Sequence, residues 1–356
     1  MKVTSRLVLN LLLPTLLASC GGGGGDNPDT DPPIYVPTPA AVTPANQVAV
    51  AQAAVGGSQA LVLAQPLASG PSGPSAPPAS ALALAAPPPR SAAALLAGSA
   101  RRTLAATAVA PQSAGASRRS PLATTTESDT CGASGSITTT MDDRDNSSGL
   151  TVGDVVTVAF AQCRDSASDL IDGTVTATIT SLGPNTSSTT TFSASLVFGK
   201  VTSSFGATSG VIDGTVDAAA AVTSSSFQLT LTVGDKGLGI AISSASFSDG
   251  IAYAPGMRIA IGESDSGAGS STVSLDGSFS TRSIGGSVSV ATLQPFRQVG
   301  SDSYPSSGQM LITGAGGSRL RLTALDRTQL RIELDANGDG SYEASQVLPW
   351  STLSPA

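Results

Sequence analysis

Short runs in which apolar and polar residues alternate occur along the chain from about residue 127 onward. Examples are VVTVAF at 155–160, FQLTLTV at 227–233 and GSVSVATL at 286–293, and Gly, Asp, Asn or Pro bound each run. Alternation at every second position is typical of strands with one buried face, and no segment keeps a helical period. We predict an all-β domain over 127–356, with about ten to twelve strands in an antiparallel meander that forms a sandwich or a partly closed barrel.

The clearest hairpin spans residues 318–335. Aliphatic residues occupy alternate positions on both arms, with charged residues between them. The aliphatic face is therefore expected to be buried and the charged face solvated. A turn near Asp326 and Arg327 would place Arg321 opposite Glu333 as a cross-strand ion pair. The residues predicted to face the core are Leu320, Leu322, Leu330, Ile332 and Leu334.

A short signature recurs three times in this domain. It consists of Asp-Gly, then Ser or Thr, then Val or Phe, and it begins at Asp172, Asp213 and Asp276. Asp-Gly is a common turn dipeptide between antiparallel strands. We predict that each copy is a hairpin turn leading into a strand.

Residues 32–126 have a different composition, mainly Ala, Pro, Ser, Gly, Thr and Val, with Tyr35 as their single aromatic residue. Repeated prolines interrupt helices, and few large side chains are present to offset the entropy of ordering. We predict a disordered tether over 20–126, within which a short Ala-rich helix near 92–110 is compatible with the sequence. The net charge of 32–126 is +5 from five arginines, whereas 127–356 carries −11.

The composition excludes several kinds of chemistry. The 356 residues contain no histidine, so Ser-His-Asp and Cys-His machinery and His-ligated metals are impossible. The acidic domain has no basic stripe interleaved with aromatic residues, which argues against nucleic-acid binding. Asp142, Asp143 and Asp145 are the nearest approach to a glycosidase carboxylate pair, but a clustered acidic turn is not a cleft. We expect that the protein is not an enzyme.

The first twenty residues have the organisation of a secretory signal, with Lys2 and Arg6 before an apolar stretch over 7–18. Leu17-Ala18-Ser19-Cys20 resembles the bacterial lipobox. The resemblance implies a signal peptide over 1–19 and acylation of Cys20, with palmitate among the chains, and Gly21 in place of Asp implies sorting to the outer membrane. The resemblance therefore implies that the membrane is a partner of the protein, through this lipid anchor. The alternative is an ordinary signal peptide with a chance cysteine.

Beyond the lipobox, the poly-Gly run over 21–25, the Ser/Thr/Gly-rich β domain and the acidic Gly turns resemble uncharacterised lipoproteins of Gram-negative bacteria. This wider resemblance is compositional. It implies a location, on the periplasmic or the surface-exposed side of the outer membrane, and no particular activity.

Two cysteines remain after Cys20, namely Cys131 and Cys163. An even pair in an exported chain predicts a disulfide, which stabilises a domain with few aromatic side chains. Two free thiols are the alternative.

Two acidic loops are candidate calcium sites, because Ca²⁺ takes about six to eight oxygen ligands and alternating side chains of a tight loop supply them. The C-terminal loop follows an EF-hand-like start, although Gln346 stands where the closing Glu belongs, and the N-terminal loop has Ser148 in place of the turn Gly. Plain hairpin turns are the alternative for both. The candidate ligands are Asp335, Asn337, Asp339, Ser341 and Glu343 in the first case, and Asp143, Asp145, Ser147 and Asp154 in the second.

These observations favour a non-catalytic outer-membrane lipoprotein that presents its β domain for binding, to an envelope polysaccharide or protein, or for a structural role. A calcium-dependent carbohydrate-binding or adhesion module is the second hypothesis, and an exposed Trp350 would favour it. The third is a His-free glycan-cleaving enzyme, which needs two carboxylates facing each other across a cleft.

Overall fold

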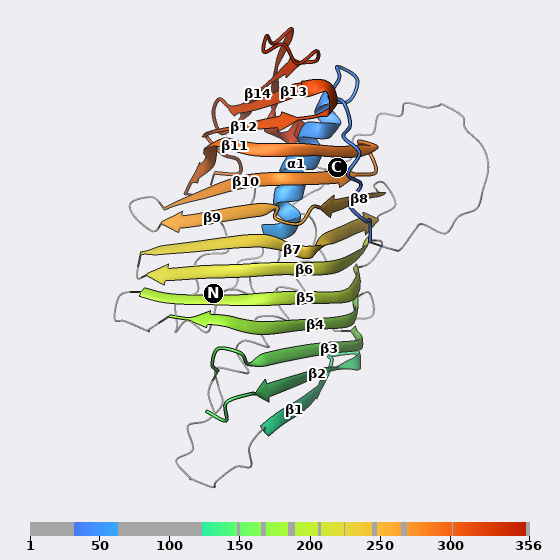
Figure 1. Cartoon of the computed structure of the whole chain (residues 1–356), viewed down its shortest axis with the longest axis vertical. Helices are drawn as coiled ribbons and strands as arrows, with labels where there is room; N and C mark the ends of the chain where they lie inside the picture. The colour runs from blue at the N-terminus through green and yellow to red at the C-terminus, as the bar shows by residue number, and fades with distance from the viewer. Residues whose placement is uncertain are drawn as a thin grey trace, which may run out of the picture.

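The strands of the chain form one continuous antiparallel sheet (Figure 1). The predicted signal peptide, Cys20, the poly-Gly run and the region around 92–110 lie outside the residues that the structure describes. This computed structural model describes residues 32–62, 123–147, 150–164, 169–183, 189–205, 208–223, 225–243, 248–264, 269–300 and 302–353.

The sheet has 15 strands, and their order in space follows their order in the chain, apart from β9. The strands are β1 (Ala123–Thr130), β2 (Ser134–Asp143), β3 (Val155–Arg164), β4 (Asp169–Leu182), β5 (Thr189–Phe205), β6 (Thr208–Thr223), β7 (Ser226–Ser243), β8 (Ser248–Tyr253), β9 (Arg258–Ser264), β10 (Ser270–Thr281), β11 (Gly286–Val299), β12 (Ser307–Thr313), β13 (Arg319–Ala324), β14 (Gln329–Asp335) and β15 (Ala344–Pro349).

Strands β8 and β9 share one place in the sheet, between β7 and β10. β8 pairs with the second half of β7, and β9 pairs with the first half. Both also pair with β10, so they act as one strand interrupted between Tyr253 and Arg258. The sequence of this gap, Ala-Pro-Gly-Met, accounts for the interruption, because Pro255 has no backbone N–H to donate and Gly256 has a φ of +80°.

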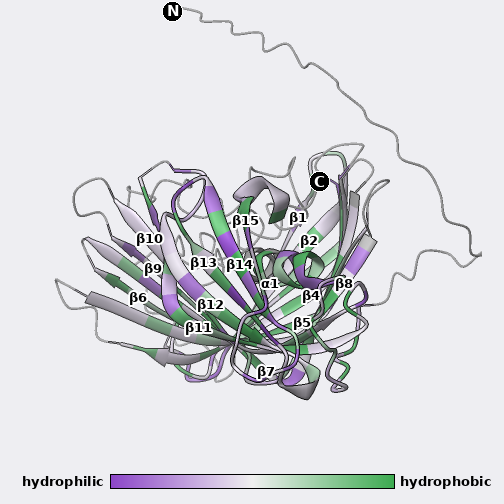
Figure 2. Cartoon of the chain, turned by 90° about the horizontal axis from the view of Figure 1, so that it is seen from above, coloured by the Kyte–Doolittle hydropathy of each residue, from purple (hydrophilic) through white to green (hydrophobic). Residues whose placement is uncertain are grey.

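The all-β antiparallel meander predicted from the sequence is confirmed. Its strands belong to a single sheet, not to two packed sheets, and the sheet is curved, with an α-helix on its concave side (Figure 2). β1 and β15 are the two edge strands, and β1 begins at Ala123, four residues before the predicted boundary at 127. The 318–335 hairpin is also as predicted: Leu320 pairs with Leu334 and Leu322 with Ile332, all at most 1% exposed.

The Asp-Gly signatures are not hairpin turns, which corrects the prediction. Gly173, Gly214 and Gly277 lie inside β4, β6 and β10, beside shifts in strand register. Their φ angles are +122°, +130° and +130°, which glycine adopts with little strain. Asp172 and Asp276 each accept a hydrogen bond from a backbone N–H of the neighbouring strand, at 3.1 and 2.9 Å. The signature is therefore a mid-strand bulge that bends the sheet.

Part of the predicted tether belongs to the folded domain, which is a second correction. Residues 43–46 form a turn before helix α1 (Gln47–Val62), and Asn46 Oδ1 accepts a hydrogen bond from Thr43 N at 2.8 Å, as in a capping box. Val50, Ala51 and Ala54 are fully buried in the core. Small aliphatic side chains on one helix face pack closely without aromatic residues. Among the described residues, no helix is long and apolar enough to span a membrane.

Residues 32–42, which we call the strap, precede α1 and run across the strand ends between β7 and β12. Pro33 lies over Gly239 and Gly250. Successive residues of a strand point to opposite faces of the sheet. Leu238 points into the apolar core, so Gly239 and the overlying Pro33 lie on the opposite face. Further along, Val42 N donates to Ser318 Oγ at 2.9 Å, and Val42 belongs to the core. The strap therefore passes from one face of the sheet to the other.

Candidate functional site

The loop between β14 and β15 brings three carboxylates together. Asp335, Asp339 and Glu343 each offer an oxygen atom, and these atoms all lie within 4.8 Å of one another. Asp335 is fully buried, whereas the other two are exposed. With Ca²⁺–O distances of about 2.4 Å, two ligands on opposite sides of one ion lie about 4.8 Å apart, so the three oxygens fit around a single calcium ion.

Backbone amides hold this loop in shape. Asp335 accepts hydrogen bonds from Gly338 N at 2.7 Å and Gly340 N at 2.9 Å, and Glu343 accepts one from Ala336 N at 3.0 Å. Both glycines have positive φ angles, of +76° and +93°. Asp335 therefore acts as the internal anchor of the turn, with or without an ion.

The other predicted ligands of this loop lie beside Asp339. Ser341 N donates to Asp339 Oδ1 at 2.7 Å, and Asn337 Nδ2 donates to Asp339 Oδ2 at 3.0 Å. These bonds, the Ser341 amide first, hold the pKa of Asp339 below its ordinary value. The Asp339 carboxylate is therefore ionised at neutral pH. Tyr342 stacks on Arg321 of β13, 4.2 Å from the ring centroid, and fixes the loop to the sheet.

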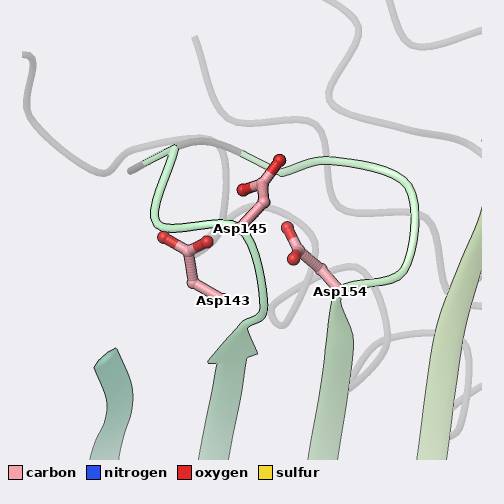
Figure 3. A group of neighbouring side chains, drawn as sticks. All are labelled: Asp143, Asp145 and Asp154. Atoms are coloured by element: carbon pink, nitrogen blue, oxygen red, sulfur yellow. The ribbon is translucent and has the colours of Figure 1, made fainter. Parts of the chain in front are cut away.

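The loop between β2 and β3 gathers Asp143, Asp145 and Asp154, whose oxygens also lie within 4.8 Å of one another (Figure 3). Asp143 ends β2, and Asp154 directly precedes β3. The fully buried Asp154 accepts hydrogen bonds from Thr151 N at 2.7 Å and Arg144 N at 3.0 Å. Its carboxylate therefore organises the loop as Asp335 does in the other one.

Ser147 supplies most of the remaining contacts of this loop. Its backbone N–H donates to Asp145 at 3.0 Å and to Asp143 at 3.2 Å. The side-chain hydroxyl of Ser147 contributes most to lowering the pKa of Asp145, followed by Thr151. The structure therefore brings the four predicted residues together at one end of the sheet, and the 335–343 loop lies at the other end.

The acidic residues considered for glycan cleavage belong to this same turn. Asp142 forms an exposed ion pair with Arg144 at 3.4 Å, and Asp143 and Asp145 share the Ser147 amide. The three carboxylates stabilise the turn between β2 and β3. This arrangement gives no support to a pair facing each other across a cleft.

The predicted disulfide is present between Cys131 and Cys163. The S–S distance is 2.05 Å, and the Cα atoms lie 5.5 Å apart. The bond joins the residue after β1 to the last part of β3, across the intervening β2, and both cysteines are buried. It covalently closes the first three strands at the edge of the sheet.

Trp350 is a core residue and is not exposed for sugar stacking. It is 1% exposed, and its indole Nε1 donates to the carbonyl of Asp326 at 3.0 Å. Tyr304 stacks on it at 6.0 Å between ring centroids, and Phe296 meets it edge-on at 6.1 Å. The sequence hypothesis that an exposed Trp350 favours a carbohydrate-binding module therefore loses this support.

The strap is the element that sequence reasoning missed. Its docking positions on the sheet are small residues, because a side chain at Gly239 or Gly314 would meet the strap backbone, and one at Gly286 would lie 2.8 Å from Thr38 O. The available signal was Thr43-Pro44, a pair typical of helix starts, which here opens the turn before α1.

The chain matches no protein-family model, no curated protein and no solved structure.

Proposed function

We propose that the chain is a lipid-anchored protein of the bacterial envelope, in which acylated Cys20 holds a non-catalytic β domain at the outer membrane. The observation that carries this proposal is the Cys131–Cys163 disulfide. Such bonds persist in oxidising compartments such as the periplasm and the cell surface. Export to these compartments agrees with the leader over 1–19 and its lipobox-like end.

The fold suits a binding or structural role. The sheet presents long strands whose solvated face is rich in hydroxyl groups, including the cross-strand pairs Ser128–Thr138 and Ser278–Ser289, with oxygens 3.1 and 3.0 Å apart. Hydroxyl groups both donate and accept hydrogen bonds, so this surface can contact a polar polymer such as an envelope polysaccharide.

Replacing Cys20 with serine tests the anchor. Acylation requires the thiol, so we expect Cys20→Ser to move the protein from the membrane pellet to the soluble fraction and to abolish palmitate incorporation. The matched control is Cys131→Ser/Cys163→Ser, which removes the other two cysteines but leaves the anchor and the membrane pelleting intact. Continued pelleting of Cys20→Ser, with palmitate still incorporated, would refute the anchor.

The second candidate function is calcium-dependent adhesion or carbohydrate binding. The three converging carboxylates of the 335–343 loop support it, and Asp335, Asp339 and Glu343 are the residues that would hold the ion. Bound calcium would offset two of the three negative charges of the cluster and tie β14 to β15, since it bridges the two ends of the turn.

A calcium titration of thermal unfolding tests this candidate. An ion present at about 100 times its dissociation constant stabilises the fold by about 2.7 kcal/mol, which raises Tm by roughly 5 to 10 °C in a domain of this size. Asp339→Asn removes one carboxylate ligand and should therefore remove the calcium-dependent shift in Tm. The fold itself should be kept, because Asp339 is exposed and does not anchor the turn. Asp302→Asn, an acidic residue outside the loop, should keep it. An identical Tm of the wild type in calcium and in chelator would exclude the ion.

A further inference from the structure

We infer that the strap edge of the sheet faces a phospholipid bilayer and that Ile34 and Val36 of the strap enter its interfacial layer. By the strap edge we mean the ends of β7, β8 and β10 near Gly239, Gly250 and Ser280, which the strap contacts. This inference rests on the proposed acylation of Cys20. It adds the orientation of the domain and the residues that touch lipid.

The strap is firmly attached to the sheet. Val36 N donates to Ser280 Oγ at 3.1 Å. Ala40 N donates to Ser287 O, and Ser287 N donates to Thr38 O, both at 2.9 Å, so the strap pairs with the beginning of β11 as a short parallel bridge. The position of the strap, and of any side chain on it, is therefore fixed relative to the sheet.

Two aliphatic side chains of the strap nevertheless point to solvent. Ile34 is 87% exposed and Val36 is 47% exposed, whereas Pro33 and Tyr35 between and beside them are partly buried. Ile34 is the most exposed large apolar side chain among the described residues. Because the strap holds these two apolar side chains away from the sheet, their contact with a second apolar medium is more favourable than their contact with water.

The length of chain before the strap identifies that phase. Eleven residues separate Cys20 from Pro32, so even a fully extended chain spans at most about 40 Å. The sheet is longer, roughly 60 Å across its strands at about 4.8 Å per strand. Pro33 lies beside β7 and β8, in the middle of this length. The anchor therefore joins the sheet near its middle, and the strap is the described segment that lies nearest to the lipid along the chain.

The charged residues next to the docking site do not oppose this contact. Asp249 and Arg282 lie in the neighbouring strand and turn and have opposite signs, and Asp249 accepts a hydrogen bond from Ser283 Oγ at 2.7 Å. The contact is therefore apolar in character, and we expect it to be insensitive to the fraction of anionic lipid.

Depth-dependent fluorescence quenching tests the orientation in the full acylated chain. With Cys20 acylated and Cys131 bridged to Cys163, Ile34→Cys supplies the one reactive thiol for an environment-sensitive fluorophore. The labelled protein is reconstituted into vesicles of phosphatidylethanolamine and phosphatidylglycerol that contain a doxyl-labelled phospholipid. The control is Leu182→Cys, at the opposite end of the strands, where Leu182 is 36% exposed.

We expect the quencher to reduce emission from position 34 by about twofold and to leave position 182 unchanged, because interfacial segments lie about 5 to 10 Å deep. Adding Val36→Asp should reduce the quenching but not the pelleting, since the backbone of Val36, not its side chain, bonds to Ser280. Pelleting without quenching at position 34, or equal quenching at both positions, would overturn the orientation alone. Failure to pellet would overturn the anchor and the orientation with it.

Discussion

The two ends of the sheet are stabilised in different ways. At the disulfide end, β1 to β3, the side chains of residues 124–130 are all exposed, and the Cys131–Cys163 bond joins the strands. At the helix end, buried aliphatic residues recur along β10 to β14, and α1 and Trp350 pack against the same core. A single-layer sheet has one apolar face to cover, so it needs either packing elements or a covalent bond where packing is sparse.

Among the variants that test this difference between the two ends, Trp350→Ala is expected to lower the free energy of unfolding most. Loss of a fully buried indole with two aromatic neighbours should lower the free energy of unfolding by about 3 to 5 kcal/mol. Amide exchange should accelerate in β12 to β15 and stay slow in β1 to β3. Val347→Ala is the control, because Val347 is 49% exposed on the same part of the chain, and it should change the free energy by less than about 0.5 kcal/mol. A uniform acceleration in both ends would contradict independent stabilisation.

Removing the disulfide is the reciprocal experiment. The bond spans a sequence separation of 32 residues, and its loss through Cys131→Ser/Cys163→Ser should lower the free energy of unfolding by about 3 to 4 kcal/mol. Exchange should accelerate in β1 to β3 and remain unchanged in β13 and β14. If β13 and β14 responded as strongly as β1, the two ends would form one cooperative unit.

Gly214→Ala acts between the two ends, at a bulge of β6. A methyl group there would meet the carbonyl oxygen of Gly237, and the φ of +130° disfavours any side chain, so we expect a loss of about 1 to 3 kcal/mol in urea unfolding. Gly199→Ala in β5 is the matched control, because its nearest contact is an ordinary 3.5 Å. Equal losses of stability in the two variants would show that a side chain at position 214 adds no strain to the bulge.

The smallest effect concerns the β13–β14 turn at the helix end. Asp326 accepts hydrogen bonds from Thr328 Oγ1, Thr328 N and Gln329 N, and the first of these contributes most to lowering its pKa below 3.8. A lowered folded-state pKa stabilises the fold above pH 3.8, and this contribution is lost as the pH falls through the folded-state value. Asp326→Asn should show a weaker loss of stability on acidification than the wild type, as followed by tryptophan fluorescence. Identical acid profiles would show that Asp326 makes no pH-dependent contribution.

The sequence predicted those parts of the fold in which local pattern and burial agree. In the 318–335 hairpin, alternation places the leucines inward, and the expected Arg321–Glu333 pair is present at 2.9 Å. The β-strand assignment held for the domain, but the count was too low, because strands such as β1, with the sequence ATTTESDT, have no apolar alternation. This edge strand is paired through its backbone and carries no hydrophobic signal.

The local sequence pattern could not predict the bulges or the docking of the strap. Asp-Gly serves equally well as a turn and as a bulge, and only the partner strand distinguishes them: Gly173 in β4 faces the backbone of Lys200 in β5. The strap docks on small residues that lie more than 200 positions away in the chain, so neither partner carries a sign of the other. In each acidic loop the carboxylates considered as calcium ligands lie close together, and calcium binding stays a prediction, whereas the burial of Asp154 and Asp335 followed from tertiary packing.

The long reach of the strap also sets an order of events during folding. The hydrogen bonds of Val36 and Val42 in the strap, and of Gln52 in α1, join residues 244, 276 and 300 positions apart. The segment that is synthesised first therefore finds its binding surface only after nearly the whole chain has followed, and contacts of such separation form slowly. Until then the strap has no sheet to dock on. Completion of synthesis is therefore the step that fixes the strap in place.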